Sequence, residues 1–398
     1  MEKINWRRRV LRYLRGCANA EWEVWDRPVR FFHWMATGLL LACLLTGWLD
    51  PPWQLDRHLM LGGILAGLWL FRLVWGLAGS EYARFSHFFC SPQAVLRDAK
   101  TLWLGQLKIA SLGLNPLNAL ISLLLLLLIG ALVLSGVVAY GGEEHLGPLA
   151  SLVSFRLGEA AKRWHKALSL IGVLLIGLHV LVVWREARLT RLPLMRSMIT
   201  GCKPLDMDHV EERYRESRLG WAIVIGTILL FSVDHWSKSL SQLPMDGWRP
   251  VHYPQVYQEK CGGCHWTIHP SLLPEERWHD LLQQLDHHFG HTIHLTGKEA
   301  IGVSSFLLVH AAEDWDTDAA HRFRKPAGDA SQFIVGHPLW QKVHDKVNPQ
   351  LFEGAPVHSR LQCPVCHHDA LSGRFDAHAI VLPHRKSRQG EVDFTPSR

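Results

Sequence analysis

The chain has 398 residues, which predicts two or three domains, and 48% of them are hydrophobic. Its formal charge of +6 is modest, and the basic residues lie beside apolar runs, which favours a membrane protein and argues against nucleic-acid binding. The 18 tryptophans and 25 histidines are typical of membrane interfaces and of metal ligation, respectively. No pattern indicates a hydrolase or a nucleotide site.

The apolar residues are concentrated between residues 31 and 235, after a basic arm over residues 1–30. The arm lacks the apolar core of a signal peptide, so the first apolar segment is expected to be an uncleaved anchor. The fifth apolar segment is the shortest, and a helix on the membrane surface is the alternative there. The predicted membrane spans are residues 31–49, 58–77, 116–140, 164–184 and 219–233.

The orientation follows from the lysines and arginines beside the spans. The arm 1–30 has 8, the loop 79–115 has 4 and the loop 185–218 has 8, against 1 in 50–57 and 3 in 140–163. Because basic loops stay in the cytoplasm, the N-terminus is predicted to be cytoplasmic. Residues after 235 are then expected in a periplasm-like compartment.

The span at 164–184 is unusual because histidines lie near both of its ends. His165 and His179 are 14 residues apart, which is roughly 21 Å along a helix and nearly one face. At matching depths, His33 of the first span pairs with His179, and His58 of the second pairs with His165. Since ionisable residues in spans are costly, we expect each pair to ligate one haem. The alternative is a set of interfacial histidines that only anchor helix ends.

Two Cys-x-x-Cys-His motifs follow the spans, and this pattern is typical of covalent c-type haem attachment. Two thiols three residues apart reach the two vinyl groups of one porphyrin, and the next histidine reaches the iron. A zinc or redox Cys-x-x-Cys is the alternative, but it does not need the histidine. No disulfide framework is expected, because the paired cysteines share one motif. The motif residues are Cys261, Cys264 and His265, and Cys363, Cys366 and His367.

The soluble part has two segments with helical spacing of apolar residues, SLLPEERWHDLLQQLDHHF and GKEAIGVSSFLLVHAA, and Ser271 is the expected cap of the first. The predicted organisation is a cytoplasmic arm at 1–30, a di-haem b transmembrane four-helix domain at 31–185, a cytoplasmic loop at 186–218, a fifth transmembrane helix at 219–235, a linker at 236–254, a periplasmic dihaem cytochrome c domain at 255–385 and a disordered tail at 386–398.

The membrane part resembles the prokaryotic cytochrome b561 family, which includes the b-type cytochrome subunits of membrane hydrogenases. The similar segments are VWDRPVRFFHW around His33, the stretch from residue 57 to 85, LNPLNAL at 114–120 and the helix with His165 and His179. The resemblance implies four core helices, two haems b held by histidines, and electron exchange with quinone. Leu114 departs from hydrogenase-type members, which tend to have histidine before Asn-Pro.

Residues 257–383 resemble a dihaem cytochrome c family, through EKCGGCHWTIHPSLLPEERW, LDHHFG, RKPAGDASQF and LQCPVCHHDALSGRFDAHAIVLP. The resemblance implies bis-histidine ligation of both haems c. It assigns His288 and His344 as the distal ligands. His291 and His294 compete with His288, because HTIHLTG follows where the family has acidic and small residues.

The predicted fold is therefore all-α: a transmembrane bundle with a four-helix di-haem b core and a fifth span, and a mainly α, loop-rich di-haem c domain. The expected function is electron transfer by two haems b and two covalently attached haems c. The expected partners are membrane lipid, quinone or quinol, and a periplasmic electron-transfer protein or oxidoreductase subunit. The expected location is the bacterial inner membrane, as a multi-pass protein.

Three functions are compatible with this pattern. The first is a quinol:cytochrome c-type oxidoreductase or electron carrier. The second is a relay subunit of a periplasmic dehydrogenase or hydrogenase without quinone activity of its own. The third is a superoxide oxidase or a haem-based sensor of small ligands. The sequence does not set the direction of electron flow.

Overall fold

The computed structural model describes residues 21–106, 113–204, 219–324 except 242, 244 and 246, and 334–383. The first 20 residues of the predicted arm, residues 205–218 of the predicted cytoplasmic loop and the predicted disordered tail lie outside these residues. The chain divides into two compact units. Unit 1 comprises Met1–Leu49, Arg57–Val137 and Ala160–Ser239, and unit 2 comprises Asp50–Asp56, Val138–Glu159 and Leu240–Arg398.

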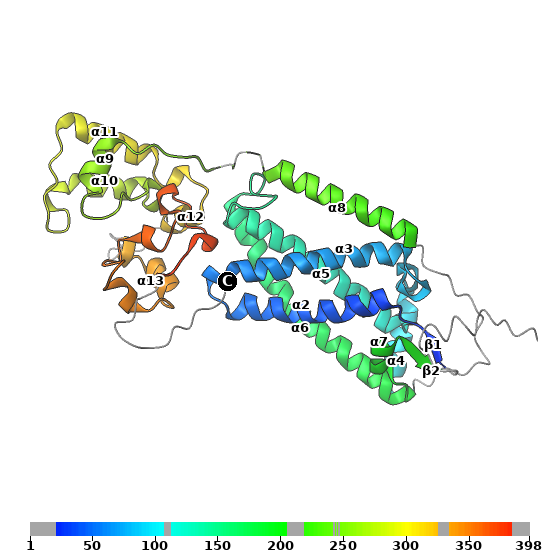
Figure 1. The fold of residues 1–398 in the computed structure, drawn as a ribbon. Coiled ribbons are helices and arrows are strands. Elements are labelled where there is room, and N and C mark those ends of the chain that lie inside the picture. Colours follow the sequence, from blue (N-terminus) through cyan, green and yellow to red (C-terminus); the bar gives the residue numbers. More distant parts are fainter. Residues whose placement is uncertain are drawn as a thin grey trace, which may run out of the picture. The chain divides into compact units, whose positions relative to one another are not determined.

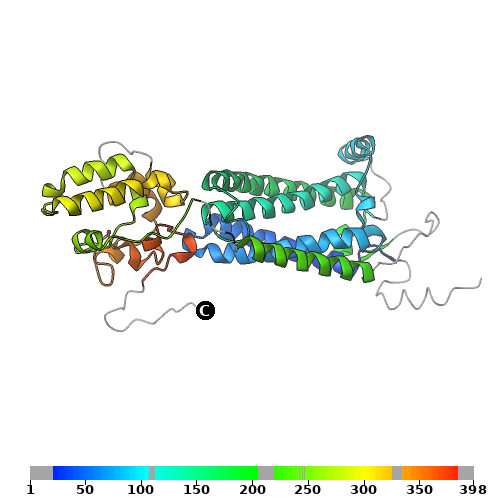
Figure 2. The same cartoon turned by 90° about the horizontal axis from the view of Figure 1, so that it is seen from above.

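Four long helices run side by side in unit 1 and form the bundle (Figure 1, Figure 2). Each is long and apolar enough to cross a membrane. Large apolar side chains such as Leu134 and Leu174 are exposed on them, as expected for helices whose outer surface faces lipid. The helices are α2 Arg27–Leu49, α3 Leu55–Ala78, α5 Pro116–Glu143 and α6 Phe155–Thr190.

The helices extend beyond the apolar segments because local signals set their ends. The carboxylate of Asp26 accepts a hydrogen bond from the Val29 N–H at 2.8 Å, so α2 begins at Arg27. The α6 helix continues through polar residues on both sides of its apolar part and ends at Thr190, shortly before Pro193. The predicted fifth span coincides with α8, Leu219–Ser241, and its crossing of the membrane remains a prediction.

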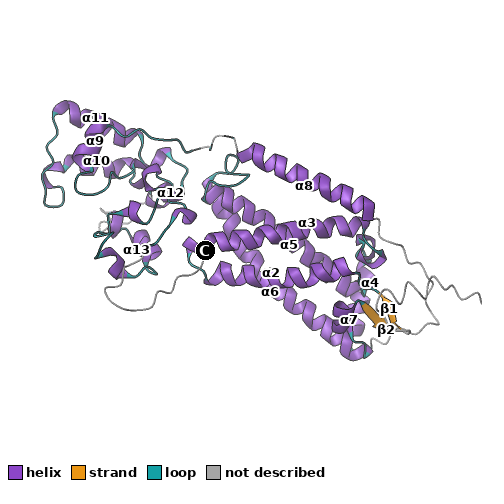
Figure 3. Ribbon diagram, in the orientation of Figure 1, coloured by secondary structure: helices purple, strands orange, loops and turns teal. Residues whose placement is uncertain are grey.

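Short elements complete unit 1. Ser91 caps α4, Pro92–Trp103, through the Ala94 N–H, and α7 spans Leu194–Thr200. The strand β1, Glu21–Glu23, pairs antiparallel with β2, Cys202–Pro204, and this small sheet was not predicted (Figure 3). Cys202 is disulfide-bonded, which the scattered cysteines had not indicated.

Unit 2 contains short helices joined by loops and tight 3-10 turns. Its helices are α9 Gln255–Cys261, α10 Glu275–Gln283, α11 Gly297–Val309, α12 Asp318–Phe323 and α13 Pro338–His344. The 3-10 turns of the described chain are η1 Pro52–Gln54, η2 Glu81–Ala83, η3 Phe85–His87, η5 Pro270–Leu272, η6 Leu285–His287, η7 Ala312–Asp314, η9 Ile334–Gly336, η10 Pro349–Phe352, η11 Cys363–Val365, η12 Ala370–Ser372 and η13 Ala377–Ala379.

The core of unit 2 is aromatic and aliphatic, with Tyr257, Trp278, Leu307 and Trp340 among its buried members. The prediction that Ser271 caps the first helix of this part was wrong, because α10 begins after Pro274. Ser271 lies buried in η5, where its hydroxyl is hydrogen-bonded to Nδ1 of His269. Ser271 therefore contacts Nδ1 of a buried imidazole, through its hydroxyl and its N–H, and does not cap α10.

The segment 138–159 contains the end of α5 and the beginning of α6, and it belongs to unit 2. Nη2 of Arg374 donates to the Glu144 carbonyl at 2.9 Å, and the Ala377 N–H donates to the Glu144 carboxylate at 2.6 Å. The Asp316 carboxylate accepts from the Phe155 N–H at 2.8 Å. These bonds hold the segment against the part of the chain after residue 310.

The predicted all-α class is confirmed, with a membrane-type bundle and a helical, loop-rich C-terminal part.

Candidate haem-binding sites

The first pair of predicted ligands comes from α2 and α6. The ring centres of His33 and His179 lie 6.5 Å apart, with an angle of 52° between the ring planes. Nδ1 of each ring is buried and, within the described part of the chain, has no hydrogen-bond partner. The two histidines that the sequence analysis paired by their depth therefore lie close together in unit 1.

The second pair comes from α3 and α6. The ring centres of His58 and His165 lie 6.0 Å apart at 82°. Nδ1 of His58 lies 3.0 Å from Oγ1 of Thr46 on α2. Nδ1 of His165 lies 3.0 Å from the carbonyl of Leu132 and 3.1 Å from Oγ of Ser135, both on α5. Such contacts orient an imidazole so that Nε2 is free for a metal.

These distances can be tested against the size of a haem iron site. A metal-bound imidazole nitrogen lies about 2 Å from the metal, and its ring centre lies about 1.2 Å farther, so two opposed imidazoles have centres roughly 6.4 Å apart. Ring separations of 6.0 and 6.5 Å fit one iron between each pair. The residues therefore fit two bis-histidine sites within unit 1.

Glycines adjoin the pair of His58 and His165, which is named the outer pair because the predicted orientation places it on the periplasmic side. A methyl group at Gly47 would lie 3.1 Å from Cε1 of His58, and one at Gly136 would lie 3.3 Å from Cε1 of His165. Both glycines therefore let a helix backbone approach an imidazole. At Gly62 and Gly63 a methyl group would meet nothing within 4 Å, whereas at Gly172 it would lie 3.3 Å from Leu128.

The first Cys-x-x-Cys-His motif begins at the end of α9 and continues into a turn. Its His265 lies 6.4 Å from His288, measured between ring centres, with a plane angle of 47°. Nδ1 of His265 lies 2.7 Å from the Trp266 carbonyl, which again leaves Nε2 for a metal. His288 thus forms the ring pair that the resemblance assigned to it.

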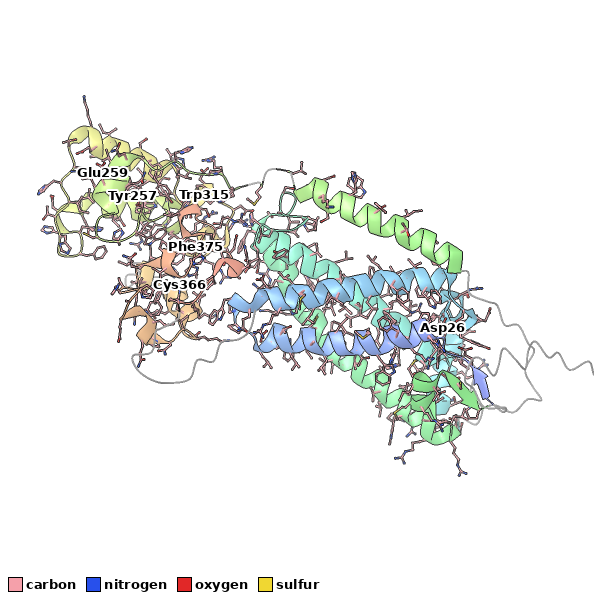
Figure 4. The ribbon with its side chains drawn as sticks, in the orientation of Figure 1. Asp26, Tyr257, Glu259, Trp315, Cys366 and Phe375 are labelled. Atoms are coloured by element: carbon pink, nitrogen blue, oxygen red, sulfur yellow. The ribbon has the colours of Figure 1, made fainter. Side chains whose placement is uncertain are left out.

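The second motif spans the turn η11. Its His367 lies 6.1 Å from His344, the last residue of α13, with a plane angle of 69°. Nδ1 of His344 lies 2.8 Å from the Trp340 carbonyl. Phe375 stands 5.2 Å from the His367 ring, in the region that Figure 4 labels with Cys366 and Phe375. This pair also fits one iron.

Burial keeps the groups of the second motif uncharged. It lowers the pKa of His367 to about 4, with a further contribution from His344, and it raises the pKa of the Cys363 thiol to about 12. Burial likewise raises the pKa of Cys261 to about 11. A neutral imidazole is the form that ligates a metal.

Zinc is the alternative occupant of the cysteine pairs. Within the described residues, no three cysteines, histidines or acidic residues gather as a metal site needs. The four histidine pairs, by contrast, all have the separation of bis-imidazole ligation.

One aromatic side chain links the two motifs. Trp266 directly follows His265, is buried, and lies 6.3 Å from Phe375 between ring centres. It packs in the same core as Cys261 and Cys363. The two motifs therefore share one core.

Sequence reasoning did not identify the residues that orient the outer pair. Thr46, Leu132 and Ser135 make contacts through helix packing, and Leu132 uses only its backbone, so no side-chain signal marks it. Gly136 was also missed, although a glycine in an apolar span is a recognisable signal for close packing.

Comparisons with known proteins match two separate parts of the chain. A family model for prokaryotic cytochrome b561 matches residues 24–201, and one for dihaem cytochrome c matches residues 257–375. A solved diheme cytochrome c from Rhodobacter sphaeroides is 28% identical, covering 32% of this chain and 99% of that one, with a TM-score of 0.28. A second structure, of DHC purified from the same organism, is 26% identical, covering 31% and 98%, with a TM-score of 0.24. A comparison with curated proteins gave no match.

Proposed function

Because this membrane electron-transfer cytochrome joins a prokaryotic cytochrome b561 region to a dihaem cytochrome c region, we propose that it moves electrons between the quinone pool and a periplasmic redox partner. It holds two haems b and two covalently attached haems c. It resides in the bacterial inner membrane with the c region in the periplasm.

The observation that carries this proposal is the repeated histidine pair. Four pairs have ring centres 6.0 to 6.5 Å apart: two lie on apolar helices and two include the histidine of a Cys-x-x-Cys-His motif. This separation suits bis-histidine iron at roughly 6.4 Å. Saturated ligation favours electron transfer over the binding of a small ligand, because no axial position is left open.

Bound haem and the side chains of the protein have different roles in the proposed function. Bound haem supplies one-electron exchange between ferric and ferrous iron. In the b region the histidines are the only proposed attachment, whereas the cysteines of the c region add two thioether bonds per haem. Thr46 and the Leu132 carbonyl hold Nδ1 of the outer imidazoles and so keep Nε2 directed at the metal.

Two features support the proposed placement across the membrane. The predicted cytoplasmic loops carry most of the lysines and arginines beside the spans. His165 and His179 stand about 21 Å apart along α6, so the two b sites lie at different depths in the bilayer. Electrons that leave the cytoplasmic side gain about 2.3 kcal/mol per 100 mV of inside-negative potential.

The haem content tests the proposal. The pyridine haemochrome assay of the purified full chain should give equal amounts of haem b and haem c, two of each per chain. If the assay detects haem c but no haem b, the four proposed membrane ligands do not bind haem. Replacing both Cys363 and Cys366 by serine should halve the haem c and leave haem b unchanged, which checks the assignment of the signal.

Quinone activity needs its own measurement. The purified wild-type protein in lipid vesicles should have its haems reduced by added quinol or oxidised by added quinone. Failure in both directions, with all four haems present, would contradict the quinone part of the proposal. The chain would then be a relay subunit that receives electrons only from a partner protein.

A further inference from the structure

A buried arginine lies on the helix that carries His58. Arg72 of α3 is 14 residues after His58, about 21 Å along the axis and close to the same face. This is the spacing that separates His165 from His179 on α6. Because His58 pairs with His165, Arg72 is placed near the depth of the inner pair, His33 and His179.

The surroundings of Arg72 are aromatic. The side chain is only 5% exposed, and its guanidinium carbon lies 5.9 Å from the ring centre of Phe32, 5.0 Å from that of Phe85 and 5.5 Å from that of Phe88. Phe32 precedes His33 in α2. The guanidinium therefore lies beside the segment that carries an inner ligand.

The hydrogen-bond capacity of this guanidinium is incompletely used. Nη1 of Arg72 is buried and has no hydrogen-bond partner among the residues that the structure describes. Rings attract a cation but accept few hydrogen bonds, and a buried cation without acceptors is costly. The site therefore calls for an anionic acceptor.

Asp26 is the acidic residue whose charge acts on Arg72. Its carboxylate already accepts from Trp75 Nε1 at 2.9 Å, from Ser80 Oγ at 2.6 Å and from the Val29 N–H at 2.8 Å. Figure 4 labels Asp26 beside the start of α2. Asp26 thus balances part of the charge and leaves Nη1 unsatisfied.

We propose that Arg72 binds a propionate carboxylate of the inner haem b, which makes it a positioning residue for that cofactor. The inference rests on the proposed function, because it needs a haem between His33 and His179. A carboxylate suits the planar fork of a guanidinium, and such a pair is strong where water is excluded. The cation compensates the propionate charge and thereby favours the reduced haem.

The test is a redox titration of the full-length, haem-loaded protein, followed by the absorbance of the inner haem b. The variant His179→Ala, which lacks the inner haem, identifies that signal. Arg72→Gln should lower the reduced-to-oxidised ratio of the inner haem about tenfold at a fixed potential, equivalent to about 59 mV. Arg72→Lys keeps the charge and should stay within about threefold of wild type, that is about 28 mV.

Arg185→Gln is the matched control. Like Arg72→Gln, this substitution removes one positive charge, here from α6, six residues after His179. The guanidinium of Arg185 donates to the carbonyls of Leu102 and Trp103 at 2.9 and 2.6 Å. In Arg185→Gln the reduced-to-oxidised ratio of the inner haem b should change by less than about threefold. In Arg72→Gln the inner potential should also become pH-dependent, because the unpaired propionate takes up a proton; a merely structural arginine would not produce this dependence.

The outcomes are distinguishable. An unchanged ratio in Arg72→Gln, with the inner haem retained, would overturn the inference. If Arg72→Gln loses the inner haem, retention in Arg72→Lys supports it, and loss in both variants overturns it in favour of a packing role. Absence of haem b from the wild type would instead refute the proposed function.

Discussion

The b and c regions reach the same histidine separation with different scaffolds. In unit 1 all four histidines stand on long helices, and helix packing sets ring distances of 6.5 and 6.0 Å. In unit 2 one partner of each pair is the histidine that ends a Cys-x-x-Cys-His motif, and the other lies at a helix end or in a loop, with distances of 6.4 and 6.1 Å. Under the proposed function, rigid helices would hold the haems of one region, and covalent attachment would hold those of the other.

This difference predicts how each region responds to the loss of a ligand. A haem b held only by two histidines depends on both. A haem c remains attached through its thioether bonds when a distal histidine is removed. The two regions should therefore fail in different ways under the same substitution.

The largest expected effect is the loss of a whole cofactor from the b region. His179→Ala should reduce haem b from two per chain to one, because His33 alone does not retain the haem. Both haems c should remain, as measured by the pyridine haemochrome assay. An unchanged haem b content would mean that His179 is not a ligand and that the pairing with His33 is wrong.

The corresponding change in the c region should alter the spectrum and leave the content intact. His288→Ala should keep both haems c but convert one to a high-spin form that binds carbon monoxide, because its sixth position opens. His291→Ala, which removes a competing histidine three residues away, is the control and should stay low-spin. Reversal of these two results would reassign the distal ligand to His291.

The same contrast explains what the sequence predicted in each region. A helix has a fixed rise and turn, so the 14-residue spacing of His165 and His179 predicted two depths and one face. The pairs with His33 and His58 followed from depth alone. The contacts of Thr46 and the Leu132 carbonyl did not, because they depend on the rotation of neighbouring helices about their axes, which the spacing of histidines does not determine.

In the c region, the motifs identified the proximal histidines, but spacing did not choose among the many others. His288 and His344 were selected only through the family resemblance, since loops and short helices carry no periodicity that relates residue number to position. The role of Ser271 was misjudged for the same reason. Its hydroxyl is hydrogen-bonded to the buried His269, and no local sequence pattern indicates that partner.

That buried histidine, His269, is expected to make the c region sensitive to acid. It is 0% exposed, its Nδ1 accepts from the Ser271 N–H at 3.2 Å, and burial, with a smaller contribution from His310, lowers its pKa to about 3. Below its ordinary pKa of about 6.5 the unfolded chain takes up a proton that the folded chain does not. Stability should therefore fall between about pH 6.5 and pH 3, by up to about 1.4 kcal/mol per pH unit.

Denaturant unfolding of the full chain in detergent, followed by haem c absorbance between about pH 7 and pH 5, measures this effect. His269→Gln should have a flatter pH dependence than wild type, because the titrating group is gone. His279→Gln, at an exposed position of α10, is the control and should keep the wild-type slope. An equal slope in wild type and His269→Gln would show that another group causes the acid sensitivity.

The smallest expected effect distinguishes the two b sites from each other. If Nε2 of His58 ligates iron, Nδ1 would carry the proton and donate to Thr46 Oγ1, which lies 3.0 Å away. Nδ1 of His33 and Nδ1 of His179 have no hydrogen-bond partner among the described residues. Thr46→Val removes this bond, which is worth roughly 1 kcal/mol. The ligand becomes less basic, so the potential of the outer haem b should rise slightly while that of the inner haem stays unchanged.

Thr37→Val is the matched control on the same helix, because Thr37 Oγ1 donates to the backbone carbonyl of His33 at 2.8 Å. Redox titration of both variants should show a shift for Thr46→Val alone. Equal shifts would mean that the loss of any hydroxyl in α2 perturbs the site through packing. A shift confined to the outer haem would establish that the two b sites, although built from equal histidine pairs, are tuned by different neighbours.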